Sequence, residues 1–295
     1  MGQEFHQIDC VLDAKAALGE CPRWSADESK LYWVDIPARL LHCFDPATGT
    51  DISRGFAQKL ACFALRRSGG FVLGLEDGFA LLDHFDGEIE PILPQVEAHR
   101  PENRFNDGRC DSLGRFWAGT LDGTKKLANG ALYRLDPDLS IRRMAEGVTT
   151  ANGLAFSPDE RRLYWADTPK HVVQAYPFDL NEGTIGTPRT LISFPIGQGR
   201  PDGASVDEAG FYWSALYAGN RVVRISPDGE IVAEIRVPAL NCTMIAFGGG
   251  DLKTAYVTTA RQGLSEEELA ANPLSGGIFS FRVDVPGLPD HRFAG

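Results

Sequence analysis

Glu20-Cys21-Pro22-Arg23-Trp24-Ser25 is the first of six related stretches, each opened by a polar or small residue a few positions ahead of a turn. The opening residues lie 41 to 50 residues apart along the chain. Self-similarity at a period in the forties, with strands and turns inside each copy, is typical of β-propeller blades. The sequence therefore predicts an all-β fold, a six-bladed β-propeller. The six opening residues are Glu20, Cys62, Asn106, Asn152, Asp202 and Thr243.

The repeat covers nearly all of the 295 residues, which favours one closed domain over residues 1–295. Each copy contains a second stretch dense in aromatic and β-branched residues, such as Leu31–Asp35, which predicts an inner strand buried on both faces. The sixth copy runs out of strands after Val283, and a strand near Ile8–Ala14 has no blade of its own. We therefore expect this N-terminal strand to complete the last blade and close the ring. The blades are predicted to start near residues 18, 60, 104, 150, 200 and 241.

Composition and charge narrow the class of protein. A hydrophobic content of 43% with 23% charged residues is ordinary for a globular chain, and the net charge of −11 argues against a nucleic-acid or anionic-membrane partner. Met1–His6 has neither the basic region nor the apolar core of a secretory signal. The six cysteines are scattered singly, so we expect free thiols and a cytoplasmic protein. The sequence does not indicate an oligomeric state.

Two links between second and third strands are longer than the others, at Leu121–Gly130 and Arg261–Gly276. The second of these contains a capping-box pattern at Ser265–Glu268 and stops at Asn272-Pro273, which predicts a short helix. In a propeller, such links lie on the same face as the residues that open the first strands. This face is therefore the expected place for a binding site.

The first strands of all blades line the central axis, so the side chains at equivalent positions should converge there. Glu20, Asn152 and Asp202 would bring together two carboxylates and one amide oxygen, without histidine or cysteine. An all-oxygen set suits hard divalent cations, and a cation would also offset the repulsion between the two carboxylates. The alternative is that these residues only cap turns, since Asn-Gly and Asp-Gly are common turn pairs. Their shared register across the copies favours a metal site.

Five segments of the chain carry a joint pattern: Leu18–Trp24, Arg104–Gly108, Ala151–Leu154, Pro201–Gly203 and Thr259–Arg261. They resemble the signature segments of the regucalcin/gluconolactonase family. This resemblance implies a six-bladed propeller with a single divalent metal that hydrolyses lactones, chiefly aldonolactones. It implies Glu20, Asn152 and Asp202 as metal ligands, with Arg104 and Asn106 binding the sugar. It also implies an acidic substrate-binding residue in the loop after Ala118-Gly119-Thr120; Asp122 is the nearest candidate, although the loop departs from the vertebrate pattern.

These residues predict a metal-dependent hydrolase that opens an aldono-1,4- or 1,5-lactone to the aldonic acid. The cation would polarise the lactone carbonyl and activate water, and Asp202 is the candidate general base, although it could act as a ligand alone. Arg104 and Asn106 are spaced for the vicinal hydroxyls of a small-molecule sugar lactone. The metal is left open among Ca²⁺, Mg²⁺, Mn²⁺, Zn²⁺ and Fe²⁺. The alternatives are a calcium-dependent phosphotriesterase or arylesterase propeller, a non-catalytic calcium-binding propeller, and a scaffold.

Overall fold

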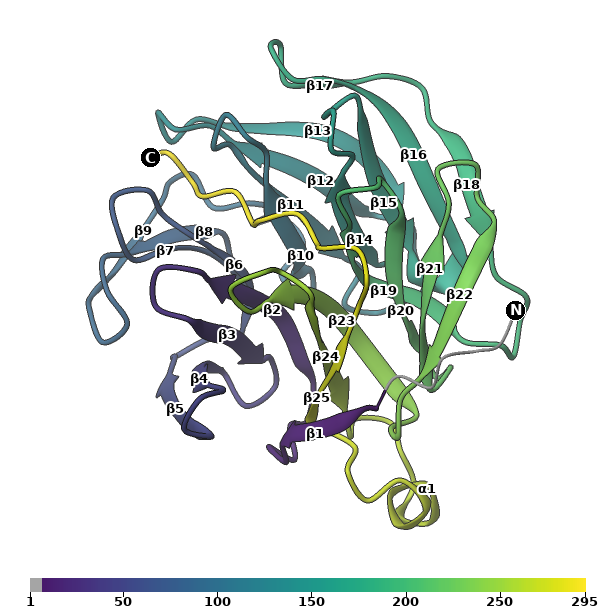
Figure 1. The fold of residues 1–295 in the computed structure, drawn as a ribbon. Helices are drawn as coiled ribbons and strands as arrows, with labels where there is room; N and C mark the ends of the chain where they lie inside the picture. The colour runs from purple at the N-terminus through teal and green to yellow at the C-terminus, as the bar shows by residue number, and fades with distance from the viewer. Residues whose placement is uncertain (1–6) are drawn as a thin grey trace.

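The computed structural model describes residues 7–295, which form six antiparallel sheets around a common centre (Figure 1). One short helix and one turn of 3-10 helix are the regular elements of the described chain that are not strands. The predicted all-β, six-bladed architecture is therefore confirmed. No helix within residues 7–295 is long and apolar enough to cross a membrane. The interpretation of Met1–His6 as no secretory signal lies outside the described residues.

The first three blades each run outward from an inner strand at the centre to an outer strand at the rim. All neighbouring strands within them are antiparallel, and most are joined by short turns; the link between the second and third strands of blade three is long. Blade one consists of β2 (Gly19–Ser25), β3 (Lys30–Asp35), β4 (Leu40–Asp45) and β5 (Thr50–Gly55). Blade two consists of β6 (Leu60–Leu65), β7 (Phe71–Leu75), β8 (Phe79–Leu82) and β9 (Ile89–Pro91). Blade three consists of β10 (Arg104–Cys110), β11 (Phe116–Leu121), β12 (Gly130–Leu135) and β13 (Ile141–Val148).

The last three blades repeat this order with additions. Blade four consists of β14 (Ala151–Phe156), β15 (Arg162–Asp167), the 3-10 turn η1 (Thr168–Lys170), β16 (Val172–Asp179), β17 (Thr184–Ile185) and β18 (Arg189–Ser193). Blade five consists of β19 (Arg200–Val206), β20 (Tyr212–Tyr217), β21 (Arg221–Ile225) and β22 (Ile231–Arg236). Blade six contains β23 (Asn241–Gly248), β24 (Thr254–Ala260), the helix α1 (Glu266–Ala271) and β25 (Ile278–Arg282). The predicted helix and its capping box at Ser265 are confirmed.

The chain closes its own ring at blade six. Strand β1 (Asp9–Leu12) pairs antiparallel with β25, with Cys10 opposite Phe279. An N-terminal strand thus provides the outer strand of a blade whose other three strands come from the C-terminal part of the chain. The predicted closure by the strand near Ile8–Ala14 is confirmed. This pairing joins the first and last parts of the ring by hydrogen bonds between strands.

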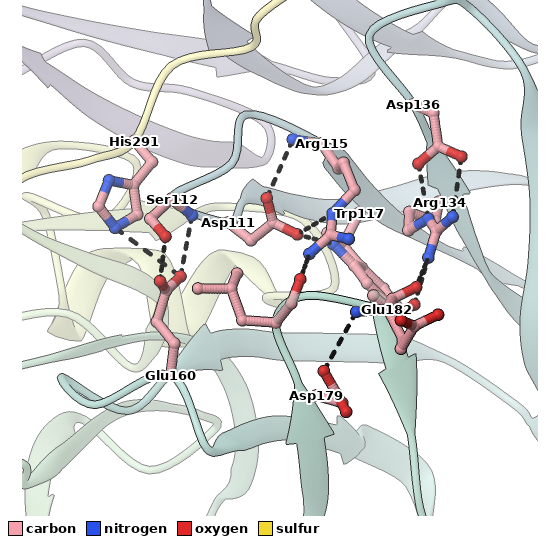
Figure 2. A network of polar contacts seen from close by, with 12 residues as sticks. Asp111, Ser112, Arg115, Trp117, Arg134, Asp136, Glu160, Asp179, Glu182 and His291 are labelled. Atoms are coloured by element: carbon pink, nitrogen blue, oxygen red, sulfur yellow. Dashed lines mark hydrogen bonds and ion pairs between the residues drawn. The ribbon is translucent and has the colours of Figure 1, made fainter.

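The second strand of each blade is buried along nearly its whole length, as its aromatic and β-branched composition predicts. In blades three and five, the indole of this strand also donates a hydrogen bond to an aspartate in the preceding turn. Trp117 Nε1 lies 2.9 Å from Asp111, and Trp213 Nε1 lies 2.9 Å from Asp207. Each aspartate also pairs with an arginine, and Figure 2 shows the blade-three cluster with Arg115. These buried carboxylates therefore have structural partners.

Residues 284–295 cross the end of the ring where the inner strands finish, and we call them the C-terminal strap. The Leu288 N–H donates to the carbonyl of Val206 at the end of β19. Asp290 pairs with Arg109 of β10 at 2.6 Å, and Phe293 is fully buried. In Figure 1 the strap is the yellow segment that leads to the C-terminus. No repeat pattern predicted this segment, which ties several blades together at one end of the molecule.

Candidate functional site

All six inner strands carry a break in pairing register close to the position of their opening residue. In β14, for example, Asn152 lies opposite Ala166 while Ala155 lies opposite Tyr164. Between these two pairs, β14 therefore contains one residue more than its partner strand β15. Such β-bulges redirect side chains and are common beside active sites. The alternative in which the Asn-Gly and Asp-Gly pairs are turn caps is wrong, because both pairs lie inside strands.

In two of the six inner strands, the residue after the opening residue has a left-handed backbone. Gly153, next to Asn152, has φ of 60°, and Cys21, next to Glu20, has φ of 49°. Glycine adopts this conformation without strain, whereas a residue with a Cβ does so uncommonly. The strained backbone at Cys21 is therefore held by the surrounding packing, since this cysteine is buried among the first two blades.

The structure brings the predicted residues together at one end of the axis. Glu20, Asn106, Asn152 and Asp202 line one hollow of about 120 Å³. A wider outer hollow of about 580 Å³ adjoins it, and the two share Arg104 in their walls. The long links predicted to face this side do so, since residues of both links line the outer hollow.

The two carboxylates of the inner hollow are unpaired and almost fully buried. Glu20 is 8% exposed to solvent, and Asp202 is 4% exposed. Neither forms an ion pair with any residue between 7 and 295. Burial, followed by repulsion from Asp202, raises the pKa of Glu20 well above its usual range. Burial, followed by repulsion from Asp107, raises the pKa of Asp202 in the same way.

A hydroxyl group fixes the orientation of the Asn152 amide. The Thr168 hydroxyl donates its hydrogen to the Pro201 carbonyl at 2.8 Å. Because that hydrogen is used, Thr168 Oγ1 can only accept from the Asn152 amide, and Asn152 Nδ2 lies 2.8 Å from it. The amide nitrogen is thereby committed to Thr168. The Asn152 Oδ1 is left on the other side, where it accepts a 2.9 Å hydrogen bond from Asn106 Nδ2 and retains a second lone pair.

Asn106 connects the inner hollow to Arg104. Its Nδ2 donates both to Asn152 Oδ1 and to the Ala151 carbonyl at 2.8 Å, which uses both amide hydrogens. Its Oδ1 accepts a 3.1 Å hydrogen bond from Arg104 Nη1, which also donates to the Phe105 carbonyl at 2.7 Å. The other guanidinium hydrogens of Arg104 have no partner among residues 7–295. Asn106 therefore positions its neighbours, and Arg104 keeps donors free for a ligand.

Asp122 is not brought together with the other predicted residues, because it lines neither hollow. Its carboxylate instead accepts hydrogen bonds from the backbone N–H groups of Thr124, Lys126 and Leu127. These bonds lower the pKa of Asp122. The carboxylate thus shapes the loop that carries Lys125, a residue of both hollows.

The inner hollow fits a divalent cation. Two buried carboxylates that form no ion pair within residues 7–295, beside an amide oxygen whose direction is fixed, are a set of oxygen donors suited to a hard cation. Within residues 7–295 there is no cluster of three or more histidine, cysteine, aspartate or glutamate side chains arranged as a metal site. Glu20 and Asp202 supply only two such groups, so Asn152 is needed to complete a protein set of three.

Four further residues of the inner hollow were missed from the sequence. Thr168 orients Asn152, while Lys125 and Arg200 act through their positive charge on Asp202. Tyr217 lies against Arg200, with the guanidinium carbon 5.1 Å from the centre of its ring. Tyr217 ends the second strand β20, Thr168 follows the second strand β15, and Lys125 lies in a link, so a search restricted to the openings of the first strands could not find these three. Arg200 is the first residue of β19, two positions before Asp202, where the repeat itself offered a signal.

Comparison with known proteins shows the family of this chain. Residues 18–261 match the family model described as the SMP-30/Gluconolactonase/LRE-like region. A 6-deoxy-6-sulfogluconolactonase from Pseudomonas putida is 47% identical over 289 residues, which cover 98% of this chain and 99% of that protein. Regucalcin from Gallus gallus is 34% identical over 296 residues, covering 98% and 99%.

A solved structure with the same architecture is that of a calcium-binding protein, regucalcin, from Agrobacterium tumefaciens. It superposes with a TM-score of 0.93 at 26% sequence identity, covering 98% of this chain and 97% of that one. The match of the family model and the identity to full-length relatives agree with the resemblance found in the sequence. The chain therefore belongs to the SMP-30/gluconolactonase/LRE-like family.

Proposed function

We propose that this protein is a carboxylic ester hydrolase that opens the ring ester of a sugar lactone with the help of a divalent cation. The observation that carries the proposal is the inner hollow, where the unpaired Glu20 and Asp202 meet the oriented oxygen of Asn152. Family membership supports the class of reaction, because the Pseudomonas putida relative is named for a lactonase activity. Aldonolactones are the proposed substrates.

Glu20, Asn152 and Asp202 would hold the cation. When bound there, it would supply positive charge that stabilises the oxygen anion developing from the lactone carbonyl. The donors are all oxygens, which suits Ca²⁺, Mg²⁺ or Mn²⁺ and leaves Zn²⁺ and Fe²⁺ as candidates to test. The name of the Agrobacterium tumefaciens structure, a calcium-binding protein, supports including Ca²⁺.

Asp202 is the proposed general base. Hydrolysis adds water to the carbonyl carbon, breaks the ring C–O bond and leaves a carboxylic acid and a hydroxyl group. Asp202 would take a proton from the attacking water, and a proton would return to the ring oxygen as it leaves. Without metal, burial and then repulsion from Asp107 raise the pKa of this carboxyl group. The free guanidinium hydrogens of Arg104 would hold the sugar hydroxyls, and Asn106 would keep Arg104 in place.

A second candidate function uses the same donors without chemistry. A calcium-binding propeller needs Glu20, Asn152 and Asp202 but has no use for a base or for Arg104. A phosphotriesterase or arylesterase propeller would instead take an uncharged aryl ester. The polar wall formed by Arg104 and Lys125 is a poor match for an apolar aryl group.

The decisive experiment is a proton-release assay on a panel of aldonolactones, with spontaneous hydrolysis subtracted. The protein is assayed after chelation and again after each divalent metal is added back. We expect hydrolysis only with metal, and loss of hydrolysis in Asp202→Asn. A matched control is Asp228→Asn, which changes an exposed aspartate of the same blade. Metal binding without hydrolysis of any lactone would favour the calcium-binding candidate, and aryl ester hydrolysis would favour the esterase.

We propose that the protein acts in the cytoplasm. All six cysteines are free, which suits a reducing environment. A small-molecule lactone is the proposed partner. The net charge of −11 supports the expectation that neither nucleic acid nor an anionic membrane surface is bound.

A further inference from the structure

We propose that the outer hollow is a subsite for an anionic group, of the sulfonate or phosphate type, carried at the end of the sugar lactone remote from the ring ester. This inference rests on the proposed function, because it assigns a substrate class to the same site. It is carried by the lining of the outer hollow, where basic side chains outnumber acidic ones and three of the basic side chains form no ion pair within residues 7–295.

The lining of the outer hollow contains five basic side chains and two acidic ones. The acidic residues are Glu76 and Glu102. The basic residues are Lys15, Lys59, Arg104, Lys125 and Arg261. This balance is the reverse of the whole chain, which has 40 acidic and 29 basic residues. A local excess of one sign on a protein of the opposite net charge concentrates ligands of that opposite sign.

Two of the five basic residues are already paired. Lys59 Nζ lies 2.6 Å from Glu76, and Lys15 Nζ lies 2.8 Å from Asp13. Arg104, Lys125 and Arg261 form no ion pair with any residue between 7 and 295. The unpaired Glu102 offsets only one of these three charges. The hollow therefore keeps a positive excess after every pairing available within it.

The position of Lys125 is fixed by hydrogen bonds within its own loop. Asp122 accepts hydrogen bonds from the N–H groups on either side of it, at Thr124 and Lys126, and so fixes the loop. Lys125 itself has a left-handed backbone, with φ of 54°, which is uncommon for a residue with a long side chain. This gives Asp122 a role as a positioning residue, in place of the direct substrate contact expected from the sequence.

The two hollows are arranged for a lactone with a charged tail. Arg104 and Lys125 line both of them, so the inner and outer hollows meet at these residues. Arg261 lines only the outer hollow, on the long link of blade six. A ring ester at Glu20 and Asp202 would therefore place its exocyclic end among Arg104, Lys125 and Arg261. Guanidinium and ammonium groups are the usual partners of tetrahedral oxyanions.

The test compares three lactones on the metal-loaded protein: glucono-1,5-lactone, 6-deoxy-6-sulfoglucono-1,5-lactone and 6-phosphoglucono-1,5-lactone. We expect kcat/KM for at least one anionic lactone to exceed that of the neutral one by about tenfold or more at low salt, and the excess to shrink as salt rises. The anionic lactone with the larger kcat/KM shows whether the subsite prefers a sulfonate or a phosphate group. Equal kcat/KM for all three lactones would overturn the subsite, whereas no hydrolysis of any lactone would overturn the proposed function.

Arg261→Gln is the variant to compare, because Arg261 lies away from the inner hollow. We expect KM for the anionic lactone to rise roughly tenfold while kcat/KM for glucono-1,5-lactone is unchanged. Asp122→Ala should raise KM for the anionic lactone through the displaced Lys125. Arg282→Gln, on the same blade but outside both hollows, is the control and should behave as wild type. If Arg261→Gln and Asp122→Ala both leave the preference for the anionic lactone intact, the assignment is wrong.

Discussion

Both ends of the propeller axis contain carboxylates shielded from solvent, but those at one end form ion pairs and those at the other end do not. At the strap end, Arg109 pairs with Asp290 at 2.6 Å, and Asp111 pairs with Arg115 at 2.6 Å. Figure 2 shows this end, where Glu160 also accepts hydrogen bonds from Ser112. At the other end, Glu20 and Asp202 form no ion pair with any residue of the described chain, although they are as deeply buried.

This difference separates structural charges from functional ones. A buried charge that has its partner contributes to a fixed packing arrangement, whereas a buried charge without a partner destabilises the fold until a ligand neutralises it. Unpaired buried carboxylates are thus an indicator of a site, while the many paired ones in the same protein are not. Substitutions at the site end should therefore change activity or metal binding, whereas substitutions at the strap end should change stability.

The largest effect is expected from Asp202→Asn at the site end. Removal of a general base lowers the rate by about 10²- to 10⁴-fold, and loss of a metal ligand adds to this. Lactone hydrolysis should therefore become undetectable above the spontaneous rate, while circular dichroism shows an intact fold. Near-wild-type kcat in Asp202→Asn would remove this residue from the mechanism.

Asp290→Ala tests the strap end. The change leaves the largely buried Arg109 without its carboxylate partner, and breaking such a pair costs up to about 3 kcal/mol. Denaturant unfolding should show this loss, while kcat of the folded variant stays at the wild-type value. Asp284→Ala, an exposed position on the same strap, is the control and should be neutral. A variant with normal stability and impaired catalysis would show that the two ends are not separate.

Thr168→Val tests the orientation of the Asn152 amide. Valine removes the oxygen that binds Asn152 Nδ2, so the amide can turn and present nitrogen to the cation. Loss of such a supporting contact typically lowers metal affinity by about 10- to 100-fold, measurable by isothermal titration calorimetry. Thr190→Val on the outer strand β18 is the matched control. Equal metal affinity in both variants would argue against this role for Thr168.

The smallest effect is expected in the pH dependence of stability without metal. The folded pKa of both Glu20 and Asp202 is raised above the unfolded value, so the folded state holds these protons longer than the unfolded state does. Stability of the chelated protein should therefore fall as pH rises from the ordinary carboxyl pKa, about 4, toward the raised values. Thermal melts should show this slope in wild type and a shallower slope in Asp202→Asn. A slope of the opposite sign would contradict the shifts.

Local sequence patterns were sufficient to predict the six blades and the convergence of their opening residues at the central axis. The aromatic second strands and the turn residues repeat in fixed order, and equivalent positions in a closed ring must converge, which brings Glu20, Asn152 and Asp202 together. The closing strand β1 was predicted because blade six lacked a fourth strand.

The remaining features depend on contacts between distant, non-repeating segments. Thr168 and Lys125 lie outside the repeated openings, and the strap has no counterpart in any blade, so no periodicity marks them. The substrate contact expected of Asp122 could not be judged from sequence either. Its carboxylate is used by its own loop, which depends on how residues 122–127 fold.

The pairing of β1 with β25 has a consequence for how the molecule is made. A growing polypeptide can assemble five complete sheets in order as it leaves the ribosome, but residues 9–12 must wait until residues 278–282 have emerged. Until then the nascent chain holds an unmatched edge on its last sheet. Pairing of β1 with β25 therefore comes late in folding, because the molecule can become a ring only when almost the entire chain has been translated.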